Sequence, residues 1–342
     1  MNFVSKTVSL AAAIVLSAGV AAASPTINIV FDPTAASGVG YSAADKAVVQ
    51  NAVNFYTSNM LSNFTLTIAF SSQNGGGGTS GTLNYDAVPY NTGTYNYYSS
   101  LVAASSGNAT DASAILSLGL AGANNPVTGT STVRMSSTLA SLLLNPLSGL
   151  TQASSSFASC GGLTANGCVQ IGTDLLNVGG SPLSAMFGVV QHEIDEVLGS
   201  ASALPNGGTG GVPTTPGVAD LFRYSAAGTR SFALNSSTSG PCSGTPTAYF
   251  SVDGGNTNIQ SYNNCNNGGD YGDWYCSDGS QVQCYGGPSN GSAALTLTSP
   301  EVQLLDAIGY NFVGPSSVPE PSSFVLIGSA LAALGFRRKL RR

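Results

Sequence analysis

The chain contains one histidine, His192, and it stands four residues before a carboxylate, Glu196. In a helix this spacing places both side chains on one face, one turn apart. Imidazole nitrogen and carboxylate oxygen both bind zinc, so the pair predicts a metal site. Glu193, beside the histidine, is placed to act as a general base that takes a proton from an attacking water. These residues predict metal-assisted hydrolysis.

The same helix does not supply a third ligand. An extended form of the motif would place one three positions after Gly199, where Ser202 is a poor metal ligand. We therefore expect Asp220, on the segment that follows the helix, to complete the site. A carboxylate in place of a second imidazole adds negative charge at the ion, which makes a bound water less acidic and favours harder metals. Zinc is the expected ion, and calcium is the alternative.

The motif lies near the end of a segment with strong helix signals. Ser181 is suited to the N-cap, Pro182 to the first helical position and Gly199 to the end of the helix. An apolar stripe at helical spacing is expected to face the core: Met186, Val190, Ile194 and Val197.

Hydrophobic patterns predict the elements before the motif. Alternating, β-branched runs indicate strands at 26–32 and 64–70, and an apolar stripe indicates a helix from residue 42 or 43 to residue 56. Residues 71–82, with four consecutive glycines, are expected to form a flexible loop. A short helix is expected at 136–144. The strand–helix–strand opening is typical of a β-α-β unit and favours an α+β fold.

Two further elements are predicted after the motif. Residues 219–224 are expected to be a strand or extended segment, and residues 298–309 a helix capped by Thr298 or Ser299 and ended by Gly309.

Both ends of the chain carry export features. Residues 1–23 combine a cation at Lys6, an apolar run and small residues at 21–23, which predict a cleaved secretory signal peptide. At the other end, an apolar stretch at 324–336 precedes an arginine-rich tail. This stretch is shorter than the ~20 residues of a full membrane span, so only transient membrane anchoring is expected.

Between these ends the chain is acidic. Four Lys and Arg residues stand against fifteen Asp and Glu residues, for a formal charge near −11. This charge argues against nucleic acid as a partner.

All six cysteines lie in the exported part: Cys160, Cys168, Cys242, Cys265, Cys276 and Cys284. An even number of cysteines outside the cytoplasm predicts three disulfides. We expect Cys160–Cys168 as a local loop and the other four paired among themselves. The Gly-, Asn- and Cys-rich residues 236–292 are expected to form a long disulfide-tied insertion.

Four aspartates in this part of the chain offer a separate calcium site: Asp253, Asp270, Asp273 and Asp278. Their spacing does not match an EF-hand, and aspartates that form Asx turns explain them equally well.

The C-terminal residues resemble a known sorting signal. Pro319, Glu320 and Pro321, followed by a short apolar stretch and an arginine-rich end, closely resemble the PEP-CTERM signal of Gram-negative bacteria. The resemblance implies cleavage by an exosortase and delivery to the cell surface or extracellular matrix.

The motif helix resembles that of the zincin metallopeptidases. More closely, the His-Glu-Ile-x-Glu-Val-x-Gly stretch at 192–199 and the Asp-Leu-Phe-Arg-Tyr stretch at 220–224 resemble a bacterial PEP-CTERM-linked metalloprotease family. Segments at 250–255 and 268–274 also fit that family. The resemblance implies that His192 binds zinc, Glu193 is the general base and Glu196 replaces the second histidine.

The resemblance also implies a domain organisation. A zincin-like α+β domain with a mixed sheet would span 24–313 and include the insertion, and a linker with the sorting signal would span 314–342.

Together these features predict a secreted, surface-sorted zinc peptidase that acts as a monomer on protein or peptide substrates. The alternative is a zincin-shaped adhesin or biofilm-matrix protein without catalysis. A third reading is a disulfide-rich surface protein that binds no metal.

Overall fold

The computed structural model describes residues 24–33, 37–119, 122–144, 147, 150, 157–179, 181–204, 212–233, 248–265, 269–276, 280–286 and 293–313. The predicted signal peptide, the sorting signal and its apolar stretch lie outside these residues. Within them, no helix is both long and apolar enough to cross a membrane.

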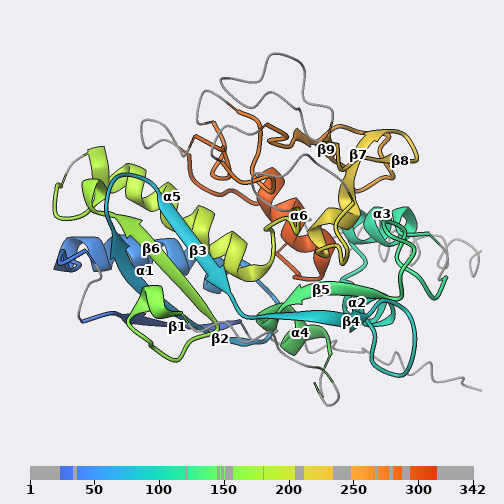
Figure 1. Ribbon diagram of the computed structural model, residues 1–342, viewed down its shortest axis with the longest axis horizontal. Helices are drawn as coiled ribbons and strands as arrows, with labels where there is room; N and C mark the ends of the chain where they lie inside the picture. The colour runs from blue at the N-terminus through green and yellow to red at the C-terminus, as the bar shows by residue number, and fades with distance from the viewer. Residues whose placement is uncertain are drawn as a thin grey trace, which may run out of the picture.

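The protein has an α+β fold (Figure 1). Its strands are β1 (Thr26–Phe31), β2 (Thr65–Gln73), β3 (Gly78–Thr82), β4 (Asn84–Pro89), β5 (Thr132–Ser136), β6 (Gly167–Gly172), β7 (Arg223–Ala226), β8 (Thr229–Arg230), β9 (Tyr249–Phe250) and β10 (Gln260–Ser261). Its helices are α1 (Ala43–Asn59), α2 (Tyr97–Ala104), α3 (Ala109–Ser117), α4 (Ser137–Leu143), α5 (Ser181–Leu198) and α6 (Pro300–Ile308). Short 3-10 helices span Ala158–Cys160, Thr173–Leu175 and Ala219–Phe222.

The main sheet is mixed, with strand order β1-β2-β6-β3. β1, β2 and β6 run parallel, and β3 runs antiparallel to β6 at the edge. α1 joins the parallel strands β1 and β2, as the β-α-β pattern predicts. α5 packs beside α1 and against β3 and β6, so the motif helix lies directly on the sheet (Figure 1).

Local capping and one buried hydrogen bond fix α1 against α5. The Ser42 hydroxyl accepts a hydrogen bond from the Asp45 backbone N–H, and the Asp45 carboxylate accepts one from the Ser42 N–H. This reciprocal capping box starts the helix where the sequence predicts. Further along, the Tyr56 hydroxyl lies 2.7 Å from Asp195 Oδ1, to which it donates a hydrogen bond.

Between β3 and β6 the chain forms a two-stranded pair, β4-β5, and after α5 it adds a second sheet with the order β10-β9-β7-β8. The chain in and around this second sheet contributes large buried side chains to the hydrophobic cluster that contains α1 and the main sheet, among them Phe250, Tyr262 and Trp274. The described parts of residues 236–292 therefore contribute to the central core.

One predicted loop is largely strand. β2 continues to Gln73 and β3 occupies Gly78–Thr82, inside the segment 71–82 that was expected to be flexible. Glycine in a strand lowers the stability of that strand, but it also allows the backbone to approach a neighbouring element closely. A Cβ at Gly78 would lie 2.5 Å from Glu193 Oε1, so at this position β3 passes too close to α5 for any side chain.

The predicted strand at 219–224 is only partly a strand. Ala219–Phe222 forms a 3-10 helix, and β7 begins at Arg223. The Asp220 carboxylate accepts a hydrogen bond from the Gly217 N–H at 2.9 Å, which holds the chain in a tight turn where the apolar pattern indicated extension.

Candidate metal centre

α5 presents the motif residues to a cleft and its apolar stripe to the core. Met186, Val190, Ile194 and Val197 are fully buried, as the helical spacing predicts. Gly199 adopts a positive φ of 123°, and its N–H bonds to the Asp195 carbonyl, which ends the helix at the expected residue. His192 and Glu196 therefore lie one turn apart on a rigid, capped element.

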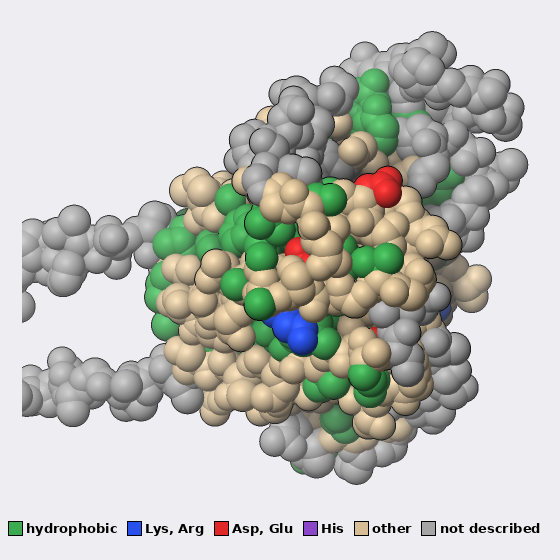
Figure 2. Space-filling model, turned by 90° about the vertical axis from the view of Figure 1, so that its left-hand side faces the viewer, with side chains coloured by type: hydrophobic (Ala, Val, Ile, Leu, Met, Phe, Trp, Pro, Cys, Tyr) green, Lys and Arg blue, Asp and Glu red, His purple; other side chains and the backbone are tan. Residues whose placement is uncertain are grey.

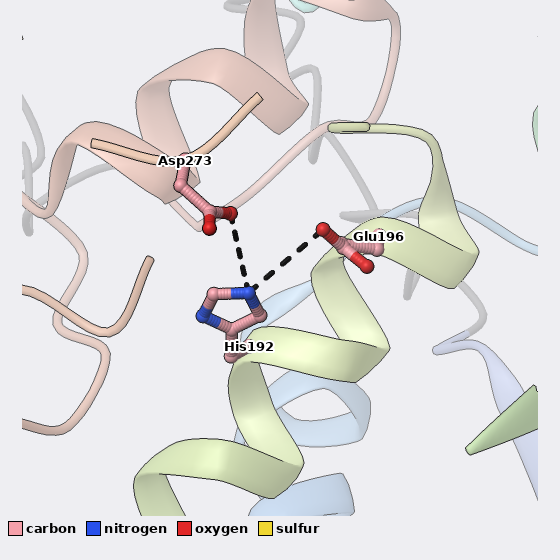
Figure 3. A group of neighbouring side chains, drawn as sticks. All are labelled: His192, Glu196 and Asp273. Atoms are coloured by element: carbon pink, nitrogen blue, oxygen red, sulfur yellow. Dashed lines mark ion pairs between the residues drawn. The ribbon is translucent and has the colours of Figure 1, made fainter. Parts of the chain in front are cut away.

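Three metal-ligand atoms converge on one point (Figure 3). His192 Nε2 lies 3.8 Å from Glu196 Oε1 and 3.3 Å from Asp273 Oδ1. The ligand atoms of all three residues lie within 4.8 Å of one another. Asp273 comes from the disulfide-bonded segment after β10, more than seventy residues along the chain from the motif helix.

A hydrogen bond orients the imidazole. His192 Nδ1 lies 3.0 Å from the Val282 carbonyl oxygen. Because a carbonyl can only accept, Nδ1 carries a hydrogen, and loss of the Nε2 proton to a bound cation would turn the lone pair of Nε2 toward Glu196 and Asp273. Metal-binding histidines are commonly held in this way.

In each carboxylate of the group, one oxygen accepts a hydrogen bond and the other does not. Ser80 Oγ donates to Glu196 Oε2 at 2.6 Å, and the Asp270 N–H donates to Asp273 Oδ2 at 3.2 Å. The other oxygens, Glu196 Oε1 and Asp273 Oδ1, are buried and have no hydrogen-bond partner among the described residues. Such acceptors are costly unless a cation satisfies them. The side chains therefore fit a metal ion.

The pKa shifts of the three residues also favour a bound cation. Burial raises the pKa of Glu196, and the nearby Glu193 raises it further. Burial likewise raises the pKa of Asp273, against the opposing effect of His192. For His192, burial lowers the pKa, but Asp273, Glu193 and Glu196 outweigh it and hold the pKa well above 6.5. The group thus strongly favours a gain of positive charge, which a bound cation would provide.

Glu193 lies next to this group without belonging to it. Its side chain is 4% exposed, and Oε2 has no hydrogen-bond partner among the described residues. Burial raises its pKa to about 7, His192 acts against this shift, and Asp273 adds to it. A carboxyl group in this condition can exchange a proton near neutral pH.

The group opens into a cleft of about 580 Å³. Small, acidic and aromatic residues line it: Gly76, Gly77, Gly78, Thr79, Ser80, Val189, His192, Glu193, Glu196, Gly269, Asp270, Asp273, Tyr285 and Gly286. No lysine or arginine is among them. β3 therefore borders one side of the cleft, α5 forms its floor, and the disulfide-bonded segment forms the opposite side.

Asp220, the expected third ligand, lies outside the group. Its Oδ1 accepts from the Ser202 hydroxyl at 2.6 Å, and its Oδ2 accepts from the backbone N–H groups of Ala203 and Gly217. Both oxygens are occupied in holding the turn after α5. Among the described residues, Asp273, and not Asp220, lies next to His192 and Glu196.

The aspartates considered for calcium have different surroundings in the described part of the chain. Asp253 accepts hydrogen bonds from Ser251 and Thr257, as expected for a turn-forming aspartate. Asp273 belongs to the group around His192, and the backbone N–H of Asp270 supports it. Asp278 lies outside the described residues. The signal for Asp273 was present in the sequence, in the Gly-Gly-Asp-Tyr-Gly-Asp-Trp segment, but spacing alone did not connect it to His192.

Two disulfides are defined. Cys160–Cys168 is the local pair expected from the sequence, and Cys276–Cys284 closes a second loop of the same sequence separation, 8 residues. Cys265 is also disulfide-bonded, and Cys242 lies outside the described residues.

Comparison with known proteins identifies the C-terminal signal. Residues 317–339 match the family model of the PEP-CTERM protein-sorting motif, which includes Pro319, Glu320 and Pro321. No curated protein and no solved structure matches the chain. The motif marks the protein as an exported protein of the Gram-negative surface-sorting class, a substrate of exosortase.

Proposed function

We propose that this surface-sorted protein is a metal-dependent peptidase, with an ion held by His192, Glu196 and Asp273 and with Glu193 as general base. The observation that carries the proposal is the convergence of three ligand atoms, two of them buried carboxylate oxygens that accept no hydrogen bond among the described residues, beside a buried glutamate in a cleft. The zincin-like fold implied by the motif belongs to the same proposal. A motif helix packed on a mixed sheet supports it.

The residues divide the chemical work. A bound divalent ion would supply the positive charge that polarises a water molecule and the scissile carbonyl. Glu193 takes a proton from the attacking water and delivers it to the leaving amine nitrogen. Val282 keeps the hydrogen of His192 on Nδ1, and Ser80 keeps one oxygen of Glu196 turned toward the ion site.

Zinc is the proposed ion. An imidazole nitrogen is a usual ligand of zinc and of other transition metals, whereas calcium sites use oxygen ligands alone. Two carboxylates beside one imidazole also suit manganese. Calcium remains the alternative that elemental analysis would distinguish.

A polypeptide is the substrate class that fits the cleft best. β3 pairs with β6 along one edge, and no described strand pairs with its other edge. An extended peptide can add to such an edge through backbone hydrogen bonds. The glycines of residues 76–78 line the cleft together with Glu193, so a peptide added at this edge would lie along the cleft.

The first test is elemental analysis of the purified, exported protein. We expect close to one zinc per chain, and we expect His192→Ala to lose it. Glu193→Gln should keep the metal and the fold but lose at least about a hundredfold in hydrolysis of an unfolded protein substrate, the usual contribution of a general base.

The other outcomes separate the alternatives. Unchanged hydrolysis in Glu193→Gln would exclude Glu193 as the base. Bound metal without hydrolysis of any unfolded protein would favour the non-catalytic adhesin or matrix protein. A folded protein without metal would favour the purely structural reading.

A further inference from the structure

The metal centre is assembled from two parts of the chain, and a disulfide ties one of them. α5 supplies His192 and Glu196. The second part, here called the tied loop, consists of the described residues 271–276 and 280–285 around the Cys276–Cys284 disulfide. It supplies the proposed ligand Asp273 (Figure 3). It also supplies the carbonyl of Val282, which orients His192.

Backbone hydrogen bonds join the two segments of the tied loop. The Trp274 N–H donates to the Gln283 carbonyl at 2.7 Å, and the Tyr285 N–H donates to the Trp274 carbonyl at 3.1 Å. Trp274 follows the ligand Asp273, and Gln283 follows Val282. The disulfide joins the chain next to these contacts, so it fixes both contributions to the metal centre relative to each other.

The same loop is anchored on the helices next to the site. The Gln283 N–H donates to Glu301 Oε1 on α6 at 3.0 Å, and Gln283 Nε2 donates to the His192 carbonyl at 2.9 Å. Both anchors involve the residue adjacent to Val282. A chain free to separate at Cys276–Cys284 would loosen these bonds together with the position of Asp273.

We propose that metal binding at His192, Glu196 and Asp273 depends on the Cys276–Cys284 disulfide, so that the centre becomes competent only after export. This inference rests on the metal site of the proposed function. In the reducing cytoplasm the two thiols stay reduced. Outside it, a disulfide-bearing oxidant accepts two electrons, the thiols lose two protons, and the new S–S bond closes the loop while the oxidant becomes a dithiol.

The chain contains its own matched control. Cys160–Cys168 has the same sequence separation, 8, so removing either disulfide changes the entropy of the unfolded chain by a similar amount. Cys160 and Cys168 pack with Ala69 in a small cluster of their own and contribute no residue to the metal group. A difference between the two variants therefore reports on the site, and not on loop closure in general.

The experiment measures zinc affinity by competition with a chromophoric chelator, using the oxidised full chain. The wild type is measured first. We expect Cys276→Ser/Cys284→Ser to weaken zinc binding at least tenfold, the range seen when residues that orient metal ligands are lost, and Cys160→Ser/Cys168→Ser to leave it unchanged. Circular dichroism establishes that each variant is folded.

A second measurement uses the wild type alone and applies even if a variant fails to fold. Coupling is reciprocal, so bound zinc must protect the disulfide that supports its site. In a glutathione redox buffer at equilibrium, followed by thiol trapping, we expect saturating zinc to lower the ratio of reduced to oxidised Cys276–Cys284 at least tenfold and to leave the ratio for Cys160–Cys168 unaffected.

Equal zinc affinity in both variants, with no selective protection, would overturn the inference and leave the metal site intact. Failure of the oxidised wild type to bind zinc would overturn the proposed function and this inference together.

Discussion

At the scale of single residues, the neighbours of a carboxylate decide its role. Asp220 and Asp273 are both buried, but both side-chain oxygens of Asp220 already accept hydrogen bonds, and two of these three bonds come from backbone groups. Asp273 keeps one oxygen unpartnered among the described residues, facing His192. The first arrangement stabilises a turn, and the second offers a ligand.

These environments predict opposite effects for one chemical change. Asp273→Asn removes a charge from the ion site and should weaken zinc binding tenfold or more, with little loss of stability. Asp220→Asn leaves a backbone N–H facing an amide N–H₂ and should lower the free energy of unfolding by about 1–3 kcal/mol. Its zinc stoichiometry should stay at the wild-type value. Equilibrium dialysis and urea unfolding of both variants test this, and loss of zinc from Asp220→Asn alone would reverse the assignment.

At the level of residues, the sequence predicts the site only where a local pattern, such as helical spacing, sets the distance between two side chains. The relation between His192 and Glu196 follows from helical spacing, and the helix signals were strong enough to place both correctly. Asp273 could not be found in this way, because its position depends on how a distant loop packs on α5. The expectation for Asp220 rested on chain order alone, whereas the packing of the turn after α5 brings its carboxylate to Ser202, Ala203 and Gly217.

At the scale of elements, cap residues and apolar periodicity predicted α4, α5, α6 and the start of α1 to within a residue or two, and α1 runs three residues past its predicted end at residue 56. The elements that were missed depend on contacts between segments. β3 is a glycine-containing strand that exists because it pairs with β6. The turn at Ala219–Phe222 is held by a buried carboxylate, so the hydrophobic pattern carried no sign of it.

The junction of α3 and α6 gives the chain a pH-dependent stability. Burial, together with the nearby Asp111, raises the pKa of Asp306 to about 7. Asn108, the N-cap residue of α3, acts against this shift by donating a hydrogen bond to Asp306 at 2.9 Å. The unfolded value is about 4. Below about pH 4 both states hold the proton and the group has no effect. As the pH rises to about 7 the unfolded state ionises first, so folding loses free energy, and above pH 7 the loss is complete.

Asp306→Asn should remove this dependence. We expect the variant to gain stability relative to the wild type by about 2 kcal/mol between pH 5 and pH 8, because only the wild type pays for the buried charge. Urea unfolding at both pH values measures the difference, and Asp174→Asn, at an exposed carboxylate, is the control. If the free energy of unfolding differed between Asp306→Asn and the wild type by the same amount at both pH values, the assignment would be contradicted.

At the scale of the whole molecule, charge is scarce and unevenly placed. On the face seen in Figure 2, charged side chains are sparse among hydrophobic and uncharged polar groups. Four carboxylates, by contrast, line one cleft. Concentrating acids where few charges exist elsewhere is a cost to folding that a bound cation would offset, which is consistent with a functional cleft.

The sorting signal determines where this cleft operates. The thirteen residues 324–336 are too short for a full membrane span, yet apolar enough, with the basic tail behind them, to hold an uncleaved chain at a membrane. Replacing Pro319, Glu320 and Pro321 with alanine should therefore block exosortase cleavage. In an exosortase-bearing Gram-negative host, the variant should remain in the membrane fraction at its uncleaved mass, while the wild type reaches the surface without its tail. Pro315→Ala, just outside the matched residues, is the matched control and should behave as the wild type. Release of the triple variant at the wild-type mass would show that the triplet does not direct processing, and that the metal centre reaches the surface by another route.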